Sequence, residues 1–144
     1  MESQIVVERI DPAHPVPLPR RATSDSACFD LCASERVVLE SGRVALVPTG
    51  LRMTAPEGTF LEVRPRSGLG SKGVVMVNAP GTIDRDYSGE VRVPLTYLFP
   101  GSYVIESGDR IAQIRLVEDH PAEFVEGHVV PRASRNGGFG STGR

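Results

Sequence analysis

Short runs of valine, isoleucine and leucine, mostly at alternate positions, recur along this chain between proline, glycine, serine and aspartate residues. Alternation with a period of two is typical of half-buried β-strands. In the last run, Ala112, Ile114 and Leu116 share one apolar face, and Gln113 and Arg115 take the other. The runs predicted to be strands are residues 4–10, 36–40, 43–51, 59–65, 73–77, 90–98 and 109–117.

The residues that separate these runs also leave little room for helices. The chain contains 12 prolines and 15 glycines, and only residues 66–72 predict a short helix. Many short strands at close spacing indicate an all-β sandwich, barrel or jelly roll. The strand pattern stops at about Ser134, so the last residues are predicted to be mobile when nothing is bound.

Composition narrows the possible partners. The chain has 144 residues, 40% of them hydrophobic, which predicts one globular domain with its own core. The formal net charge of −2 does not suggest nucleic acid or a membrane as partner. No apolar run reaches the length of a transmembrane span, and the N-terminus lacks the pattern of a signal peptide. A cytoplasmic protein is therefore expected.

The two cysteines, Cys28 and Cys32, would lie on one face of an extended stretch, roughly 13 Å apart at about 3.3 Å per residue. This separation is too large for a disulfide, and two thiols alone make a poor metal site. We interpret both as small buried hydrophobic residues in a reducing compartment. Asp30, an acid among apolar residues between them, is predicted to be either paired or functional.

One stretch suggests acid–base chemistry. NAPGTIDRDYSGEV, residues 78–91, predicts a hairpin with turns near APG and YSGE. If its middle is extended, Asp84 and Asp86 share one face beside Tyr87. A carboxylate at the mouth of a hairpin can accept a proton from water. The alternative is structural, since both aspartates could cap the turn or pair with Arg85.

Two other stretches can be interpreted either as functional or as ordinary structural elements. PRSGLGSKG, residues 65–73, combines exposed backbone N–H groups with Arg66 and Lys72, which suits phosphate oxygens, although it lacks the spacing of a Walker loop. The alternative is an ordinary turn between strands. SGDRIAQIRLV, residues 107–117, is consistent with a simple surface strand.

Five stretches occur in a fixed order between Ala22 and Gly143. They are ATSDSACFDLCA, RSGLG, GTIDRDYSGEV, GDRIAQI and GGFGSTG. In this order and at this spacing, they strongly resemble the homotrimeric dUTPase family, the deoxyuridine 5′-triphosphate nucleotidohydrolases. The third and fifth stretches are the most specific.

The resemblance implies a distorted, β-barrel-like jelly-roll subunit over residues 1–133 and a mobile C-terminal lid over residues 134–144. Three subunits would form a closed ring, and each lid would complete a neighbouring subunit's active site. The implied reaction is hydrolysis of dUTP to dUMP and pyrophosphate, with Mg²⁺ on the triphosphate. It would limit uracil in DNA and supply dUMP for thymidylate synthesis.

The resemblance assigns the reacting and base-binding roles to residues of the hairpin. Asp84 would activate a water for in-line attack on the α-phosphorus. Tyr87 would lie under the deoxyribose, where its ring leaves no room for a 2′-hydroxyl. The uracil edge would be read by Asn78 and by the backbone near Thr82, Ile83 and Arg92.

The remaining roles concern the triphosphate and the lid. Phosphate oxygens would be bound by Arg66, Ser67, Gly68 and Gln113. Asp30 would order the waters around Mg²⁺, which the triphosphate itself mainly holds. Phe139 would stack on the uracil ring as the lid closes. The γ-phosphate would accept hydrogen bonds from Arg135, Gly140, Ser141 and Thr142.

Two departures from the family pattern bear on the site. Cys28 stands where a glycine is usual, close to Asp30. The family's arginine stands five residues before the phenylalanine of the fifth stretch, whereas Arg135 is four residues before Phe139 and Arg132 is seven before it. We assign the phosphate-binding role to Arg135.

Two rival functions would need other features. A dCTP deaminase shares this fold, but it uses a different base-recognition hairpin and lacks a GGFGSTG lid. A module that binds dUTP and signals its level without turnover would have no need for Asp84.

Overall fold

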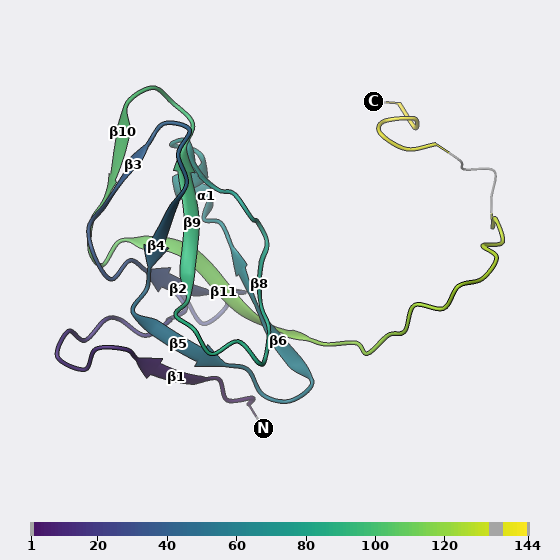
Figure 1. Cartoon of the computed structure of the whole chain (residues 1–144), viewed down its shortest axis with the longest axis horizontal. Helices are drawn as coiled ribbons and strands as arrows, with labels where there is room; N and C mark the ends of the chain where they lie inside the picture. The colour runs from purple at the N-terminus through teal and green to yellow at the C-terminus, as the bar shows by residue number, and fades with distance from the viewer. Residues whose placement is uncertain (1, 133–136, 144) are drawn as a thin grey trace.

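In the computed structural model, which describes residues 2–132 and 137–143, the protein is built almost entirely from β-strands (Figure 1). The strands are β1 (Val6–Arg9), β2 (Phe29–Cys32), β3 (Val37–Glu40), β4 (Ala45–Pro48), β5 (Leu51–Thr54), β6 (Thr59–Arg64), β7 (Val74–Met76), β8 (Gly81–Ile83), β9 (Arg92–Tyr97), β10 (Ser102–Ile105) and β11 (Arg110–Glu118). One short helix, α1, covers Ser67–Gly70. The prediction of an all-β fold is confirmed.

The strands of the described residues form four small sheets and no closed barrel. The central sheet has the order β2-β11-β6-β8, and a second sheet has the order β4-β9-β7. The other two sheets are the pairs β1-β5 and β10-β3. The long strand β11 lies between β2 and β6, and its Gln113 is opposite Asp30 on one side and Arg64 on the other. This register brings together residues that are far apart in the sequence.

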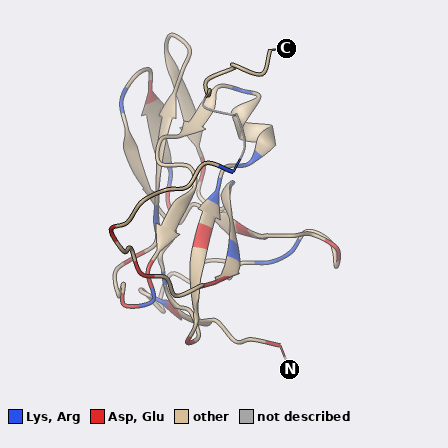
Figure 2. Cartoon of the chain, turned by 90° about the vertical axis from the view of Figure 1, so that its right-hand side faces the viewer, with Lys and Arg blue, Asp and Glu red and all other residues tan. Residues whose placement is uncertain are grey.

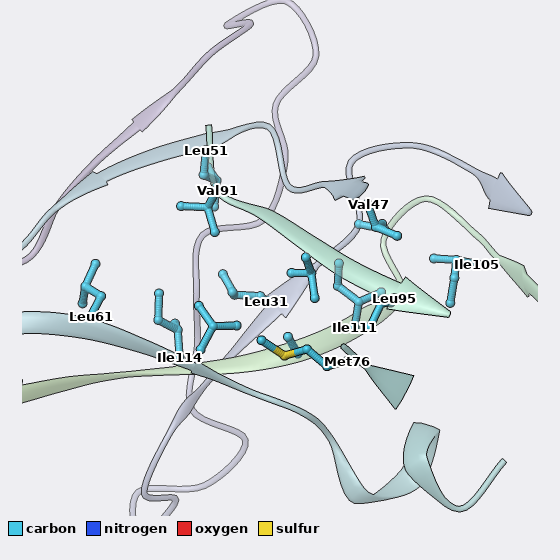
Figure 3. Packing of buried hydrophobic residues seen from close by; sticks show 14 of the residues in the cluster. Leu31, Val47, Leu51, Leu61, Met76, Val91, Leu95, Ile105, Ile111 and Ile114 are labelled. Carbon is cyan, nitrogen blue, oxygen red and sulfur yellow. The ribbon is translucent and has the colours of Figure 1, made fainter. Parts of the chain in front are cut away.

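Alternate residues of the larger sheets supply one hydrophobic core. The buried side chains of this cluster include Leu31, Leu61, Ile114, Val47, Leu95 and Met76 (Figure 3). Burying one leucine or isoleucine side chain is worth about 1.5–3 kcal/mol. On β11, Ala112 and Ile114 are buried while Gln113 is not, so the alternation predicted for this strand is confirmed.

Most of the predicted runs coincide with strands, and the predicted helix is observed as the shorter α1. The run 43–51 is an exception, because a turn at Thr49 and Gly50 divides it into β4 and the start of β5. Gly50 has a φ of 69°, a left-handed conformation that interrupts a strand. β2, β8 and β10 were not among the predicted runs.

Basic and acidic residues are interspersed over the strands and loops in Figure 2. In the described residues no helix is long and apolar enough to cross a membrane. After β11, residues 119–132 form no strand or helix, and beyond Pro121 the chain runs away from the sheets (Figure 1). The exposed side chains of this segment include Phe124, Val125, Val129 and Val130.

Candidate active site

One group of predicted site residues gathers around Asp30 on β2. The Asp30 side chain is only 15% exposed, and its Oδ1 lies 3.7 Å from Nε of Arg66. Its Oδ2 lies 3.6 Å from Nη1 of Arg110, and Gln113 is the cross-strand neighbour of Asp30. Arg66 also donates a hydrogen bond from Nη1 to the backbone oxygen of Arg110, at 3.0 Å. Asp30 is therefore paired, as one of the two interpretations of the sequence required.

Arg110 was not among the predicted site residues, and a β-bulge explains why. Simple alternation from Gln113 places Arg110 on the opposite face of β11. The pairing with β2 shifts register between Arg110 and Ala112, so that Arg110 lies opposite Cys32. The extra residue of the bulge is Ile111, which is buried beside the equally buried Ala112. The shift brings Arg110 to the face that carries Asp30.

The loop after β6 adds backbone donors next to this group. α1 starts directly after Arg66, whose backbone is extended, and no side chain caps the helix. The first N–H groups of a helix lack partners within it, so those of Ser67 and Gly68 suit an anion. Two guanidinium groups and this loop surround a single carboxylate. Such a group can hold a polyanion and a cation bound to that polyanion.

The cysteines beside this group are both free thiols. Each is half-buried, so the prediction that they are buried holds only in part. Burial raises the pKa of the Cys32 thiol, and the nearby Asp30 carboxylate raises it further. A raised pKa keeps Cys32 protonated and a weak nucleophile at neutral pH.

The second group of predicted site residues lies in the hairpin of residues 78–91. β8 pairs with β6, which places Thr82 opposite Glu62 and Ile83 opposite Leu61. Asn78 is exposed just before the cis peptide bond between Ala79 and Pro80.

The strand ends at Ile83, earlier than the sequence suggested. The N–H of Tyr87 donates to the backbone oxygen of Asp84 at 3.0 Å, so these residues close a turn. The prediction that Asp84 and Asp86 lie on one face of an extended segment is therefore wrong. The tight turn replaces the alternation of a strand here.

Tyr87 is fixed within this hairpin, although its ring is partly exposed. Its hydroxyl donates to the backbone oxygen of Glu90 at 2.9 Å. The ring lies so close to Gly89 that any Cβ at position 89 would overlap the Tyr87 hydroxyl. Gly89 is thus required by the path of the Tyr87 side chain, and neither Gly89 nor Glu90 was among the predicted site residues.

The surface next to Asp84 is acidic. Asp84 and Asp86 line one hollow together with Glu57 and Asp119, and Arg85 is the only basic residue of that lining. Four carboxylates would repel a triphosphate. This hollow is consequently unsuited to a triphosphate within a single chain.

The two groups of residues lie at opposite ends of β6. Ile83 is opposite Leu61, so Asp84 follows next to Phe60, whereas Arg66 is beyond the other end of the strand. Six residues of extended chain span about 20 Å at roughly 3.3 Å per residue. That distance is far longer than a triphosphate. One chain therefore does not bring Asp84 together with Asp30, Arg66 and Gln113.

The glycine-rich tail makes only local contacts in the described residues. The Phe139 ring is fully exposed, and the N–H of Ser141 donates to the backbone oxygen of Gly138 at 3.1 Å. Gly140 has a φ of 88°, and both Ser141 and Thr142 are exposed. Arg135 lies outside the described residues.

The described residues contain no cluster of three or more His, Cys, Asp or Glu side chains that could form a metal site. Magnesium, however, is commonly held by one or two carboxylates together with substrate phosphates and waters. Asp30 offers one such carboxylate, next to the loop that is predicted to bind phosphate. The donor set therefore fits a cation that arrives with the phosphates.

Comparison with known proteins gives a consistent result. The dUTPase family model matches residues 14–143. The deoxyuridine 5′-triphosphate nucleotidohydrolase of Solibacter usitatus is 42% identical over 142 residues, covering 98% of this chain and 97% of that protein. The enzyme of the same name from Thermobifida fusca is 43% identical over 143 residues, covering 97% of this chain and 79% of that protein.

A solved structure agrees with the sequence comparisons. A mutant dUTPase of Staphylococcus bacteriophage 80alpha with dUpNHpp has a TM-score of 0.82 and 26% identity, and the match covers 97% of this chain and 98% of that chain. This likeness confirms the predicted jelly-roll fold.

Proposed function

Because this chain belongs to the dUTPase family and is a dUTP diphosphatase, we propose that it hydrolyses dUTP by in-line attack of a water on the α-phosphorus, with Asp84 as the general base. The products are dUMP and pyrophosphate. The observation that carries the proposal is the turn that holds the exposed Asp84 carboxylate next to Tyr87. One short turn would then join the general base to the ring that lies under the sugar, so that both face the same nucleotide.

The site is proposed to form between subunits of a homotrimer. Support comes from the separation of about 20 Å along the chain between the position of Asp84, beside Phe60, and Arg66, which pairs with Asp30. A second copy would bring its own Arg66, Ser67, Gly68 and Gln113 next to Asp84. Those basic and backbone donors would supply what the acidic surface around Asp84 lacks.

The phosphates would be bound by Arg66, Gln113 and the backbone of Ser67 and Gly68. Magnesium would accompany the triphosphate, with Asp30 holding its waters, and it would supply neutralisation of phosphate charge when bound. Asp30 also keeps the Arg66 guanidinium in place, at 3.7 Å.

The nucleoside would lie against the hairpin. Asn78 and the backbone of Thr82, Ile83 and Arg92 would bind the uracil edge. The Tyr87 ring would lie under the deoxyribose and exclude a 2′-hydroxyl by steric overlap. The lid of residues 134–144 would come from a neighbouring subunit, stack Phe139 on the base and exclude water. Gly140, Ser141, Thr142 and Arg135 would donate to the γ-phosphate.

In the cell, this reaction would limit the incorporation of uracil into DNA and provide dUMP for thymidylate synthesis. In the proposed pocket the Tyr87 ring would exclude a 2′-hydroxyl, so the site would favour a deoxyribonucleotide.

Pyrophosphate release from dUTP, UTP, dTTP and dCTP in the presence of Mg²⁺ tests the proposal. Wild type should release pyrophosphate from dUTP alone, and Asp84→Asn should bind dUTP but lose turnover. Asp86→Asn is the matched control, because the same charge is removed two residues away, and it should retain most of the activity. Equal losses in both variants would contradict the assignment of the base. Tight dUTP binding without turnover in wild type would favour a sensor, and ammonia release from dCTP would favour a deaminase.

A further inference from the structure

The Glu90 side chain ties the return leg of the hairpin to the body of the subunit. Its Oε2 accepts a hydrogen bond from the N–H of Gly50 at 2.9 Å. Its Oε1 accepts from Nε of Arg92 at 3.1 Å, and the Glu90 side chain is only 18% exposed. A half-buried carboxylate between a backbone N–H and a guanidinium has both of its oxygens engaged.

The partner of Glu90 is itself rigid. Gly50 has a φ of 69°, and a Cβ added there would lie 3.2 Å from both Ser34 and Val16 side-chain atoms. The backbone oxygen of Gly50 accepts from the N–H of Ile10 at 3.0 Å. The turn between β4 and β5 is thus a fixed point against which Glu90 is held.

The residue after Glu90 is tied to the same turn. The hydroxyl of Thr49, which is fully buried, donates to the backbone oxygen of Val91 at 2.6 Å. The N–H of Val91 donates to the backbone oxygen of Leu51 at 2.8 Å. The turn Thr49–Leu51 therefore holds Glu90 by its side chain and Val91 by its backbone, and we call these contacts the clamp.

This clamp reaches the ring proposed to lie under the sugar. The Tyr87 hydroxyl donates to the backbone oxygen of Glu90 at 2.9 Å, so the far end of the ring is tied to the clamped residue. Its backbone N–H is tied to Asp84 at 3.0 Å. The missing side chain of Gly89 lets the ring reach this position. Tyr87 is consequently held at both ends.

We propose that Glu90 is a positioning residue for sugar selection, which holds Tyr87 against the deoxyribose through the clamp on Thr49, Gly50 and Leu51. This inference rests on the proposed function, in which the Tyr87 ring excludes the 2′-hydroxyl. Exclusion by overlap works only if the ring cannot move aside, because a mobile ring accommodates the extra oxygen. Glu90 contributes the rigidity on which the discrimination depends.

The test compares kcat/KM for dUTP and UTP in wild type and Glu90→Gln. Glutamine has one acceptor oxygen, so it cannot accept from both Gly50 and Arg92, and its amide donors would face one of them. The ratio of the two kcat/KM values should fall about tenfold, which corresponds to about 1.4 kcal/mol. The change should come from a higher KM for dUTP and faster turnover of UTP, with kcat for dUTP falling less.

Glu62→Gln is the matched control. Glu62 is also a half-buried carboxylate, and its ion pairs are with Arg64 at 2.6 Å and with Arg115 at 3.4 Å. A comparable loss of charge pairing should therefore leave the ratio unchanged, even if the melting temperature falls. A fall in the ratio of the same size in Glu62→Gln would overturn the proposal.

Tyr87→Phe provides a second test that does not depend on the stability of Glu90→Gln. It removes the hydroxyl that reaches the backbone oxygen of Glu90 and leaves the ring in place. The ratio of kcat/KM for dUTP to kcat/KM for UTP should also fall in this variant. In the double variant the ratio should fall by less than the sum of the two single effects in free energy, because both substitutions act through the same clamp. Unchanged ratios in both single variants would overturn the proposal. Failure of wild type to hydrolyse dUTP would instead overturn the proposed function on which it rests.

Discussion

Replacing Asp30 with asparagine separates its two proposed roles. The carboxylate lies 3.7 Å from Nε of Arg66 and 3.6 Å from Nη1 of Arg110, and it would also order the waters of Mg²⁺. Asparagine keeps the size of the side chain and removes the charge. Two guanidinium groups then lie close together without a counter-ion. Binding of a polyanion should be retained or strengthened by this change, whereas organisation of the cation should be weakened.

The structure sets the expected size of the effect on stability. A unit charge pair at about 4 Å has a Coulomb energy of about 4 kcal/mol at an effective dielectric constant of 20, before desolvation is subtracted. Exposed pairs contribute about 0.2–1 kcal/mol, and breaking a fully buried pair costs about 3–5 kcal/mol. Asp30 is 15% exposed and Arg110 is 54% exposed, so this group lies between those limits. We expect a loss of roughly 1–2 kcal/mol.

Three measurements on Asp30→Asn test this reasoning. The melting temperature should fall by roughly 2–8 °C at matched protein concentration. The KM for dUTP should stay constant or fall, and kcat should fall with a rise in the Mg²⁺ concentration that gives half-maximal activity. If kcat and that Mg²⁺ concentration both equal those of wild type while the melting temperature falls, Asp30 serves only to hold the arginines. An unchanged melting temperature would refute the estimate of its pairing.

The lid carries two further predictions. Phe139→Ala should lower kcat/KM for dUTP about 10–100-fold, since stacking on a nucleobase is worth about 1–3 kcal/mol. The melting temperature should stay unchanged because the ring is fully exposed. An unchanged kcat/KM would exclude the stacking role. Arg135→Ala should lower kcat/KM strongly and Arg132→Ala should not, and steady-state kinetics with the reverse ranking would show that Arg132 is the phosphate ligand of the fifth stretch.

Those features of the fold that depend on a local repeat could be predicted from the sequence. β11 is the best example, because Ala112 and Ile114 are buried and Gln113 faces the other side, as alternation requires. The turn at Gly50 was missed because Val47 and Leu51 continue the apolar pattern on both sides of it. One glycine with a φ of 69° changes the direction of the chain without changing that pattern.

Features of the site that depend on pairing between distant strands could not be predicted in this way. Arg110 joins Asp30 only because of the bulge at Ile111. The local sign of this bulge in the sequence is the pair of adjacent apolar residues Ile111 and Ala112, both of which are buried. Glu90 is similar, since its partner Gly50 is 40 residues away in the chain. A charged residue at the first position of a predicted strand gives no sign of such a contact.

The segment after β11 connects the geometry of one chain with the proposed assembly. Phe124, Val125, Val129 and Val130 are all more than two-thirds exposed, in a stretch that lies away from the sheets (Figure 1). Full burial of such side chains is worth about 1.5–3 kcal/mol each, so leaving all of them in water forgoes a large stabilising contribution. Large exposed apolar patches in soluble proteins usually mark a contact with another chain. The same segment leads to Phe139, whose proposed partner is the uracil ring bound by the hairpin of residues 78–91. A contact of this segment with a second copy would therefore both bury its apolar side chains and carry the lid to the site that is proposed to form between subunits.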